Sequence, residues 1–278
     1  MQKRILAIND ISCMGKCSLT VALPIISSVG HECVILPTAL LSTHTAQGFG
    51  GFVSFNMTDQ MKQIADHFER LDTRFDAIYS GYIVSPDQAD YIYELVNKLA
   101  DNDTLVVVDP VLGDNGRLYR GFAEKNITAI KRLCSVADVI TPNLTEASLL
   151  TGIESDGVHM TREGVDHLLD ALSTLCKKKI VITGIEINDG ELTTAVMDVE
   201  RGETALYTRP KISGSVHGSG DVFASALTAL YLDGTSFDTA VEKALDFTLS
   251  AIADSAEDDD SRWYGVNFEK YLSGIKGI

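Results

Sequence analysis

The chain has 278 residues, 45% of them hydrophobic, and 23 Lys and Arg against 39 Asp and Glu give it a net charge of −16. A chain of this length and composition buries enough apolar surface for one large α/β domain. A surface this acidic repels phosphate backbones and anionic lipids, which argues against nucleic-acid and membrane-surface partners. The five cysteines are scattered and the first residues lead straight into a strand-like run, so we expect a cytoplasmic protein.

Short apolar runs alternate with longer helical patterns along most of the chain. Several of the runs are continuous Val, Ile and Leu, which is typical of strands buried on both faces. The expected strands are Arg4–Ile8, Glu32–Pro37, Ala77–Ser80, Leu105–Val108, Val139–Thr141, Lys179–Thr183, Leu192–Asp198 and Thr204–Tyr207. The expected helices, in which apolar residues recur at helical spacing, are Ser18–Val29, Thr58–Leu71, Pro86–Ala100, Ala123–Ser135, Thr161–Leu175 and Ser219–Leu232.

This alternation predicts a doubly wound, mostly parallel sheet with helices on both faces. The last two expected strands are joined through Glu200–Gly202 and predict an antiparallel hairpin at one edge. Because no linker, repeat or low-complexity segment divides the chain, we expect a single domain over residues 1–278. Ligands of such sheets bind at the carboxyl ends of the strands, and polar clusters of this sequence fall there.

Two carboxylates, Asp109 and Asp114, lie at and just beyond the end of the expected strand Leu105–Val108. Carboxylates in this place, with no Lys or Arg between them, suit a magnesium ion and its waters, with nucleotide phosphates as further ligands. A turn stabilised by these residues would account for either of them alone, but poorly for both.

Two later strand ends carry further polar groups. The run Val139–Ile140 leads into Thr141-Pro-Asn143-Leu-Thr-Glu146, and a second run ends in Thr183. These hydroxyls, the amide and the carboxylate are expected at the same edge of the sheet. Glu146 also fits an acidic residue in the first turn of the helix that follows.

The glycine-rich segment 214–221, Gly-Ser-Val-His-Gly-Ser-Gly-Asp, leads into an Ala-rich helix. Free N–H groups at a helix N-terminus bind anions, and glycines let an anion approach them closely. Asp221 would be a poor ligand for phosphate, because a carboxylate repels it. The residue is suited instead to act as a general base that takes a proton from an attacking hydroxyl. An ordinary helix capped by Ser219 or Asp221 is the alternative. Together with the strand-end clusters, the segment predicts a nucleotide site.

The ordered set of motifs resembles the ribokinase superfamily, and within it the pyridoxal (vitamin B6) kinase branch. The motifs are Asp-Pro-Val-x-Gly-Asp, Thr-Pro-Asn-x-x-Glu, Val-Ile-Thr and Gly-Ser-Gly-Asp, in this order. Two further elements of that branch are similar to the segments Ser42–Thr45 and Ser80–Tyr82. The resemblance covers about residues 4–255.

The resemblance implies an ATP- and Mg²⁺-dependent kinase, with a monovalent cation as a further option, that phosphorylates the 5′-hydroxymethyl group of pyridoxal, pyridoxine or pyridoxamine. It also implies a homodimer. Asp221 would be the catalytic base, and the backbone N–H groups of Gly218, Ser219 and Gly220 would form the anion hole. The other implied roles are nucleotide binding for Asp109, Thr141, Asn143 and Thr183, Mg²⁺ binding for Asp114 and Glu146, and contact with the pyridine ring for His44, Thr45 and Tyr82.

Position 10 departs from this pattern. In the B6 kinases the first strand usually leads into Ser-His, and the serine contacts the pyridine ring, whereas this chain has Asp10-Ile11. An ionised carboxylate only accepts hydrogen bonds, so Asp10 favours a protonated ring nitrogen or an amino group. The related hydroxymethylpyrimidine kinases carry an acidic residue near this place, and a hydroxymethylpyrimidine substrate is therefore the alternative.

Two other interpretations stay open at this point. A vitamer-binding protein without turnover is a possibility of another class, although the intact Asp221, Asp114 and Glu146 argue against it. The segment Gly48–Gly51 fits a flexible loop that covers the substrate.

Overall fold

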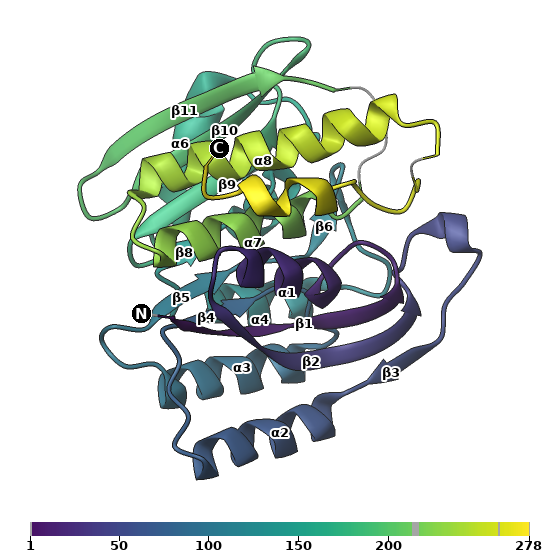
Figure 1. The fold of residues 1–278 in the computed structure, drawn as a ribbon. Helices are drawn as coiled ribbons and strands as arrows, with labels where there is room; N and C mark the ends of the chain where they lie inside the picture. The colour runs from purple at the N-terminus through teal and green to yellow at the C-terminus, as the bar shows by residue number, and fades with distance from the viewer. Residues whose placement is uncertain (1, 213–216, 261, 278) are drawn as a thin grey trace. The chain divides into compact units, whose positions relative to one another are not determined.

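The computed structural model describes residues 2–212, 217–260 and 262–277 (Figure 1). Its contacts divide the chain into two compact units, each of which is discontinuous in sequence. Unit 1 comprises Met1–Val84, Leu99–Leu105 and Ile212–Ile278, and unit 2 comprises Ser85–Lys98 and Val106–Lys211. The expectation of a single domain stays a prediction.

Four strands of unit 1 lie in the order β4-β1-β2-β3: β1 (Arg4–Met14), β2 (Glu32–Thr43), β3 (Ser54–Asn56) and β4 (Ala77–Ser80). The strand β1 pairs in parallel with β2 and β4, whereas β3 pairs antiparallel with β2. Both β1 and β2 run well past their expected ends, because their pairing resumes after a bulge between Asn9 and Ile11. This bulge brings polar residues into the middle of a strand.

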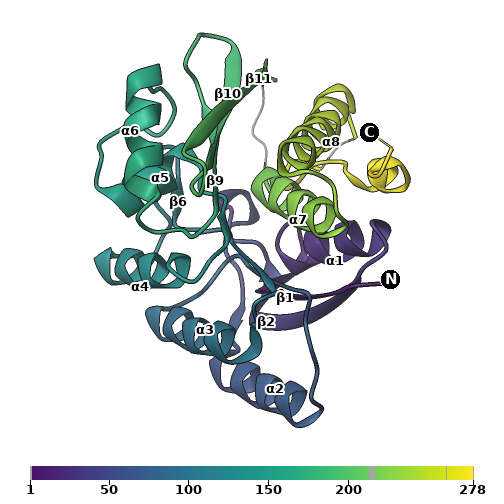
Figure 2. The same ribbon diagram turned by 90° about the vertical axis from the view of Figure 1, so that its left-hand side faces the viewer.

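Helices cover the sheet of unit 1 on both faces, with α1 (Leu19–Ser28) and α2 (Thr58–Arg70) on opposite sides of the β1–β2 pair (Figure 2). The helix α7 (Ser219–Leu232) packs against both α1 and α8 (Phe237–Glu257). We did not expect α8, although its buried residues Phe237, Ala240, Val241 and Ala244 recur at helical spacing. The short helices η1 (Gln47–Phe49) and η2 (Glu269–Gly274) complete this unit.

In unit 2, β5 (Leu105–Val108), β8 (Val139–Ile140) and β9 (Lys179–Ile185) pair in parallel. The hairpin of β10 (Glu191–Asp198) and β11 (Glu203–Pro210) continues this sheet antiparallel. A separate small hairpin, β6 (Gly113–Asp114) and β7 (Arg117–Leu118), follows β5. The helices are α3 (Pro86–Leu99), α4 (Glu124–Cys134), α5 (Leu144–Thr151) and α6 (Arg162–Leu172).

The expected architecture is confirmed: mostly parallel strands alternate with helices, and an antiparallel hairpin lies at one edge of the strands of unit 2. Across the described part of the chain, no helix combines the length and the apolar composition needed to cross a membrane.

Candidate active site

Unit 1 gathers several of the predicted residues around Asp221, in the first turn of α7. The Nδ2 atom of Asn9 donates to Asp221 Oδ1 at 3.4 Å, and Asn9 Oδ1 accepts from the backbone N–H of Tyr82 at 2.7 Å. The backbone N–H of Ser18 also donates to the Asp221 carboxylate. Asp10 interacts electrostatically with both Asp221 and Tyr82. The structure therefore brings Asp10, Tyr82 and Asp221 into one cluster.

Two glycines of the sequence motifs allow this arrangement. A Cβ atom on Gly81 would lie 2.2 Å from Asn9 Nδ2, so a larger residue would displace the amide that holds Asp221. Gly218 has a φ of +78°, and a Cβ there would lie 2.0 Å from the backbone oxygen of Lys16. Both positions thus require glycine for a close approach of neighbouring groups.

The environment raises the pKa of Asp221 to about 6. Burial is the main cause and repulsion by Asp10 adds to it, whereas the hydrogen bonds from Ser18 and Asn9 oppose the rise. Burial also raises the pKa of Asp10, against hydrogen bonds from Ser18 and Ser12. A carboxyl with a pKa of about 6 is mostly ionised at neutral pH and is a stronger base than an ordinary aspartate.

The helix α7 begins at Ser219, with Gly218 as its N-cap in the left-handed conformation. No side chain of the described residues caps this helix, so the alternative in which Ser219 or Asp221 is the cap is wrong. The first N–H groups of a helix have no intrahelical acceptor and remain available to an anion. Residues 214–216 of the glycine-rich segment lie outside the described residues.

Unit 2 brings together the predicted nucleotide residues just after β5 and β8 and within β9, which continues to Ile185 rather than ending at Thr183 as expected. Thr141 Oγ1 donates to Asp109 Oδ1 at 3.1 Å. Asn143 and Thr183 form an isolated parallel bridge, and Thr183 N donates to Pro142 O at 3.0 Å. Hydroxyl, amide and carboxylate groups therefore meet at one edge of this unit's strands, as expected from the sequence.

Glu146 is buried in the first turn of α5, where it closes a capping box with Asn143. Asn143 Oδ1 accepts from Glu146 N at 2.9 Å, and Glu146 Oε2 accepts from Asn143 N at 2.9 Å. The other oxygen, Oε1, accepts from Leu112 N at 3.0 Å. Glu146 therefore lies in the first turn of the helix, as the alternative had it, and its part in Mg²⁺ binding stays a prediction. Burial and the nearby Asp109 carboxylate raise the pKa of Glu146 well above its ordinary value.

The chemistry of this cluster fits a hydrated Mg²⁺ ion. The repulsion between Asp109 and Glu146 would be relieved by a cation, and a carboxylate oxygen can accept a second hydrogen bond from a metal-bound water. Asp114 is exposed, with its carboxylate accepting from Asn115 N and Nδ2 at 2.8 and 2.9 Å. Within the described ranges, no group of three His, Cys, Asp or Glu side chains is arranged to hold a metal ion.

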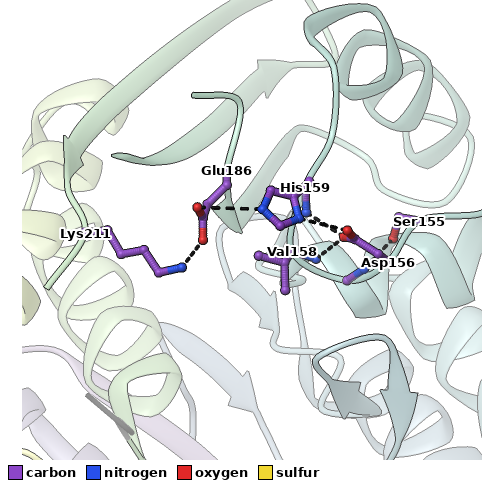
Figure 3. A network of polar contacts seen from close by, with 7 residues as sticks. Ser155, Asp156, Val158, His159, Glu186 and Lys211 are labelled. Atoms are coloured by element: carbon purple, nitrogen blue, oxygen red, sulfur yellow. Dashed lines mark hydrogen bonds and ion pairs between the residues drawn. The ribbon is translucent and has the colours of Figure 1, made fainter. Parts of the chain in front are cut away.

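A polar network fixes the segment that follows β9 (Figure 3). The buried Glu186 pairs with Lys211, which comes directly after β11, and lies 3.9 Å from His159 Nε2. Asp156 Oδ2 lies 2.8 Å from His159 Nδ1, and this contact raises the pKa of His159. Hydrogen bonds from His159 and Val158 lower the pKa of Asp156 to about 2. The network holds the chain just beyond Thr183.

The predicted ring residues His44 and Thr45 follow β2. His44 Nδ1 accepts from Ala46 N at 3.2 Å, so Nε2 carries the proton and donates to Tyr264 O at 3.0 Å. Both ring nitrogens of His44 are therefore engaged by the backbone, whereas Thr45 is exposed. Burial lowers the pKa of His44, with His217 as a second cause.

Sequence reasoning missed two residues that hold Asp221, Asn9 and Ser18. Asn9, which holds Asp221, had a signal, because it is the first polar residue after the apolar run Ile5–Ile8. Ser18 acts through its backbone N–H, which no side-chain pattern reveals.

Comparisons with known proteins agree on one family. A family model described as phosphomethylpyrimidine kinase matches residues 26–262. A structure from Bacteroides thetaiotaomicron, assigned as a phosphomethylpyrimidine kinase and solved with pyridoxal, is 34% identical, with 99% of this chain and 96% of that chain covered and a TM-score of 0.93. Pyridoxal kinase from Lactobacillus plantarum is 30% identical, with 100% and 98% covered and a TM-score of 0.90. The pyridoxal kinase PdxY of Leifsonia xyli is 27% identical, with 97% and 95% covered.

Proposed function

This chain belongs to the phosphomethylpyrimidine kinase family and is a kinase, and we propose that it transfers a phosphoryl group from ATP to the 5′-hydroxymethyl group of pyridoxal, pyridoxine or pyridoxamine. The observation that carries the proposal is Asp221, a base with a pKa of about 6 at the start of α7, beside Asp10 and Tyr82. Two of the similar proteins are named pyridoxal kinases, and a third was solved with pyridoxal.

In the proposed mechanism, Asp221 accepts the proton of the substrate hydroxyl as its oxygen attacks phosphorus. Asn9 and the N–H of Ser18 hold the carboxylate in place through their hydrogen bonds. The N–H groups of residues 218–220 face the charge that develops on the transferred phosphoryl group. These groups suit phosphoryl transfer, which needs positioning and charge stabilisation more than covalent chemistry.

We assign the nucleotide to unit 2, with Asp109, Thr141, Asn143 and Thr183 along its phosphates. Asp114 and Glu146 would hold Mg²⁺, mostly through water, as the burial and hydrogen bonding of Glu146 suit. When bound, this ion would neutralise charge on the phosphates, which otherwise meet the carboxylates of Asp109 and Glu146. The homodimer and the cytoplasmic location stay predictions.

A hydroxymethylpyrimidine substrate is the second candidate, and Asp10 is the observation that favours it. Asp10 is buried beside Asp221, and an ionised carboxylate there would accept from an amino group on the ring. The pyridoxal-related names of the similar proteins favour the vitamer instead, as does the segment Ser42–Thr45, which resembles an element of the pyridoxal kinase branch.

An ADP-release assay with Mg-ATP tests the proposal on pyridoxal, pyridoxine, pyridoxamine and hydroxymethylpyrimidine, each supplied alone. We expect the best vitamer to exceed hydroxymethylpyrimidine by at least about tenfold in kcat/KM. A higher kcat/KM for hydroxymethylpyrimidine would move the chain to the second candidate. Turnover of none of the four would refute both substrate assignments.

A further inference from the structure

Five rings from three separate segments of unit 1 form an aromatic cluster that the mechanism above does not use. Its members are His44 and Phe49 after β2, His217 before α7, and Trp263 and Tyr264 after α8. Ring centroids of Phe49 and Trp263 lie 4.7 Å apart, those of His44 and Phe49 4.9 Å, and those of His44 and His217 5.3 Å. Trp263 also lies 6.0 Å from His44 and 6.1 Å from His217. These spacings are typical of attractive aromatic pairs.

The cluster is shaped by a close fit between Gly48 and Trp263. A Cβ atom on Gly48 would lie 2.4, 2.6 and 2.8 Å from three carbons of the indole ring. Only a glycine lets the loop 44–50 rest on Trp263 without displacing it. Trp263 is 47% exposed, so the loop packs on it at the protein surface and not in the hydrophobic core.

Two members of the cluster adjoin residues of the proposed substrate site. His44, held by four rings and two backbone hydrogen bonds, directly precedes Thr45, whose side chain is exposed. His217 directly precedes Gly218, the N-cap of α7. Trp263 lies next to both His44 and His217. It can therefore set the position of Thr45, the proposed contact to the substrate ring, and of the N–H groups at the start of α7.

We propose that Trp263 is a positioning residue for the substrate ring, which it serves by holding the loop 44–50 and His217 together through the aromatic cluster. This inference rests on the proposed function, because it assigns the ring of the phosphate acceptor to the Thr45 side of unit 1. Trp263 does not take part in the chemistry, so its loss should weaken acceptor binding far more than nucleotide binding.

Kinetics of Trp263→Ala test the proposal, with Trp263→Phe as the conservative variant. We expect the KM for the vitamer to rise about tenfold or more in Trp263→Ala, with the KM for ATP changed less than about twofold, because several aromatic contacts are lost together. Trp263→Phe should restore most of the affinity. Phe52→Ala is the matched control, since Phe52 is also 47% exposed, and should leave both KM values unchanged. An equal rise in both KM values, or none, would overturn the proposal.

A double-mutant cycle tests the Gly48 contact itself. Gly48→Ala should raise the vitamer KM as Trp263→Ala does, because the added methyl group collides with the indole. In the Trp263→Ala background the same change should have little further effect, since the colliding ring is gone. Independent, additive effects of the two substitutions would contradict the inference.

Limited proteolysis without substrate separates failure of this inference from failure of the proposed function. Chymotrypsin cleaves after aromatic residues, and cleavage after Phe49 is identified by fragment mass. We expect Trp263→Ala to accelerate that cleavage and Phe52→Ala to leave it unchanged, because only the first variant removes one of the rings packed on Phe49. If the wild type phosphorylates no vitamer but this difference appears, the function is wrong and the loop contact stands. A cleavage rate after Phe49 that Trp263→Ala leaves unchanged would refute the inference.

Discussion

Replacing Asp221 with Asn should strongly reduce turnover and, at the same time, stabilise the folded protein. The base is lost, which costs roughly two to four orders of magnitude in kcat for a positioned general base. The gain in stability has a separate origin, because the folded protein holds the Asp221 carboxylate in surroundings that disfavour its charge.

The size of the gain follows from the pKa. The Asp221 pKa rises from 3.8 to about 6, which corresponds to about 3 kcal/mol between the two protonation states. A raised carboxyl pKa means that the folded state binds the proton more tightly, so folding is disfavoured as the pH rises from about 4 to about 6, and fully so above that. Because Asp221 is only half-buried, about 3 kcal/mol is an upper limit at pH 8, falling to about 1 kcal/mol at pH 4.5.

Urea unfolding of Asp221→Asn and wild type at pH 8 and pH 4.5 measures both values. Asp59→Asn is the control, because Asp59 is an exposed acidic residue in the first turn of α2. Its loss should destabilise slightly through the helix dipole rather than stabilise. An Asp221→Asn variant no more stable than wild type at pH 8, or a gain that does not shrink at pH 4.5, would refute the electrostatic account.

Three further predictions concern Asp10 beside Asp221, the N-cap of α5 and the ion pair of Glu186. The kcat/KM of the wild type should rise with pH through about 6 as Asp221 of the free protein ionises. Asp10→Asn should move this rise to lower pH by removing a repelling charge; an unmoved midpoint in the pH profile of kcat/KM would contradict that. Asn143→Ala should lower the free energy of unfolding by about 1 kcal/mol through loss of the α5 cap, as urea titration would report. Lys211→Met should lower it by about 1–3 kcal/mol, because the buried Glu186 carboxylate loses its paired cation; no change would show that the pair contributes nothing.

The residues at strand ends could be predicted because they directly follow apolar runs. Asp109 and Thr141 directly follow β5 and β8, and Thr183 follows the apolar run Ile180–Ile182 inside β9, which continues to Ile185; parallel strands bring their carboxyl ends to one edge. The resemblance to the B6 kinase branch that the ordered motifs indicated is confirmed by the family match and the similar structures. The roles of the individual site residues stay predictions.

Contacts between distant segments could not be predicted from local patterns. Asn9 and Asp221 are 212 residues apart, and only the fold brings the amide to the carboxylate. The extension of β1 beyond Asn9 could not be predicted from the apolar pattern, because a bulge places polar residues in the middle of the strand. The packing of Trp263 on Gly48 depends on the space between two loops, which periodicity does not encode.

The central claim is that the phosphate acceptor is a B6 vitamer, and one competition experiment tests it most directly. Pyridoxal, pyridoxine, pyridoxamine and hydroxymethylpyrimidine are mixed at equal concentration with Mg-ATP and the wild-type protein, and the phosphorylated products are resolved by mass. The ratio of initial rates equals the ratio of kcat/KM values. We predict that a vitamer 5′-phosphate forms at least about ten times faster than hydroxymethylpyrimidine phosphate. Faster formation of the pyrimidine phosphate, or no phosphorylated vitamer, would contradict the account.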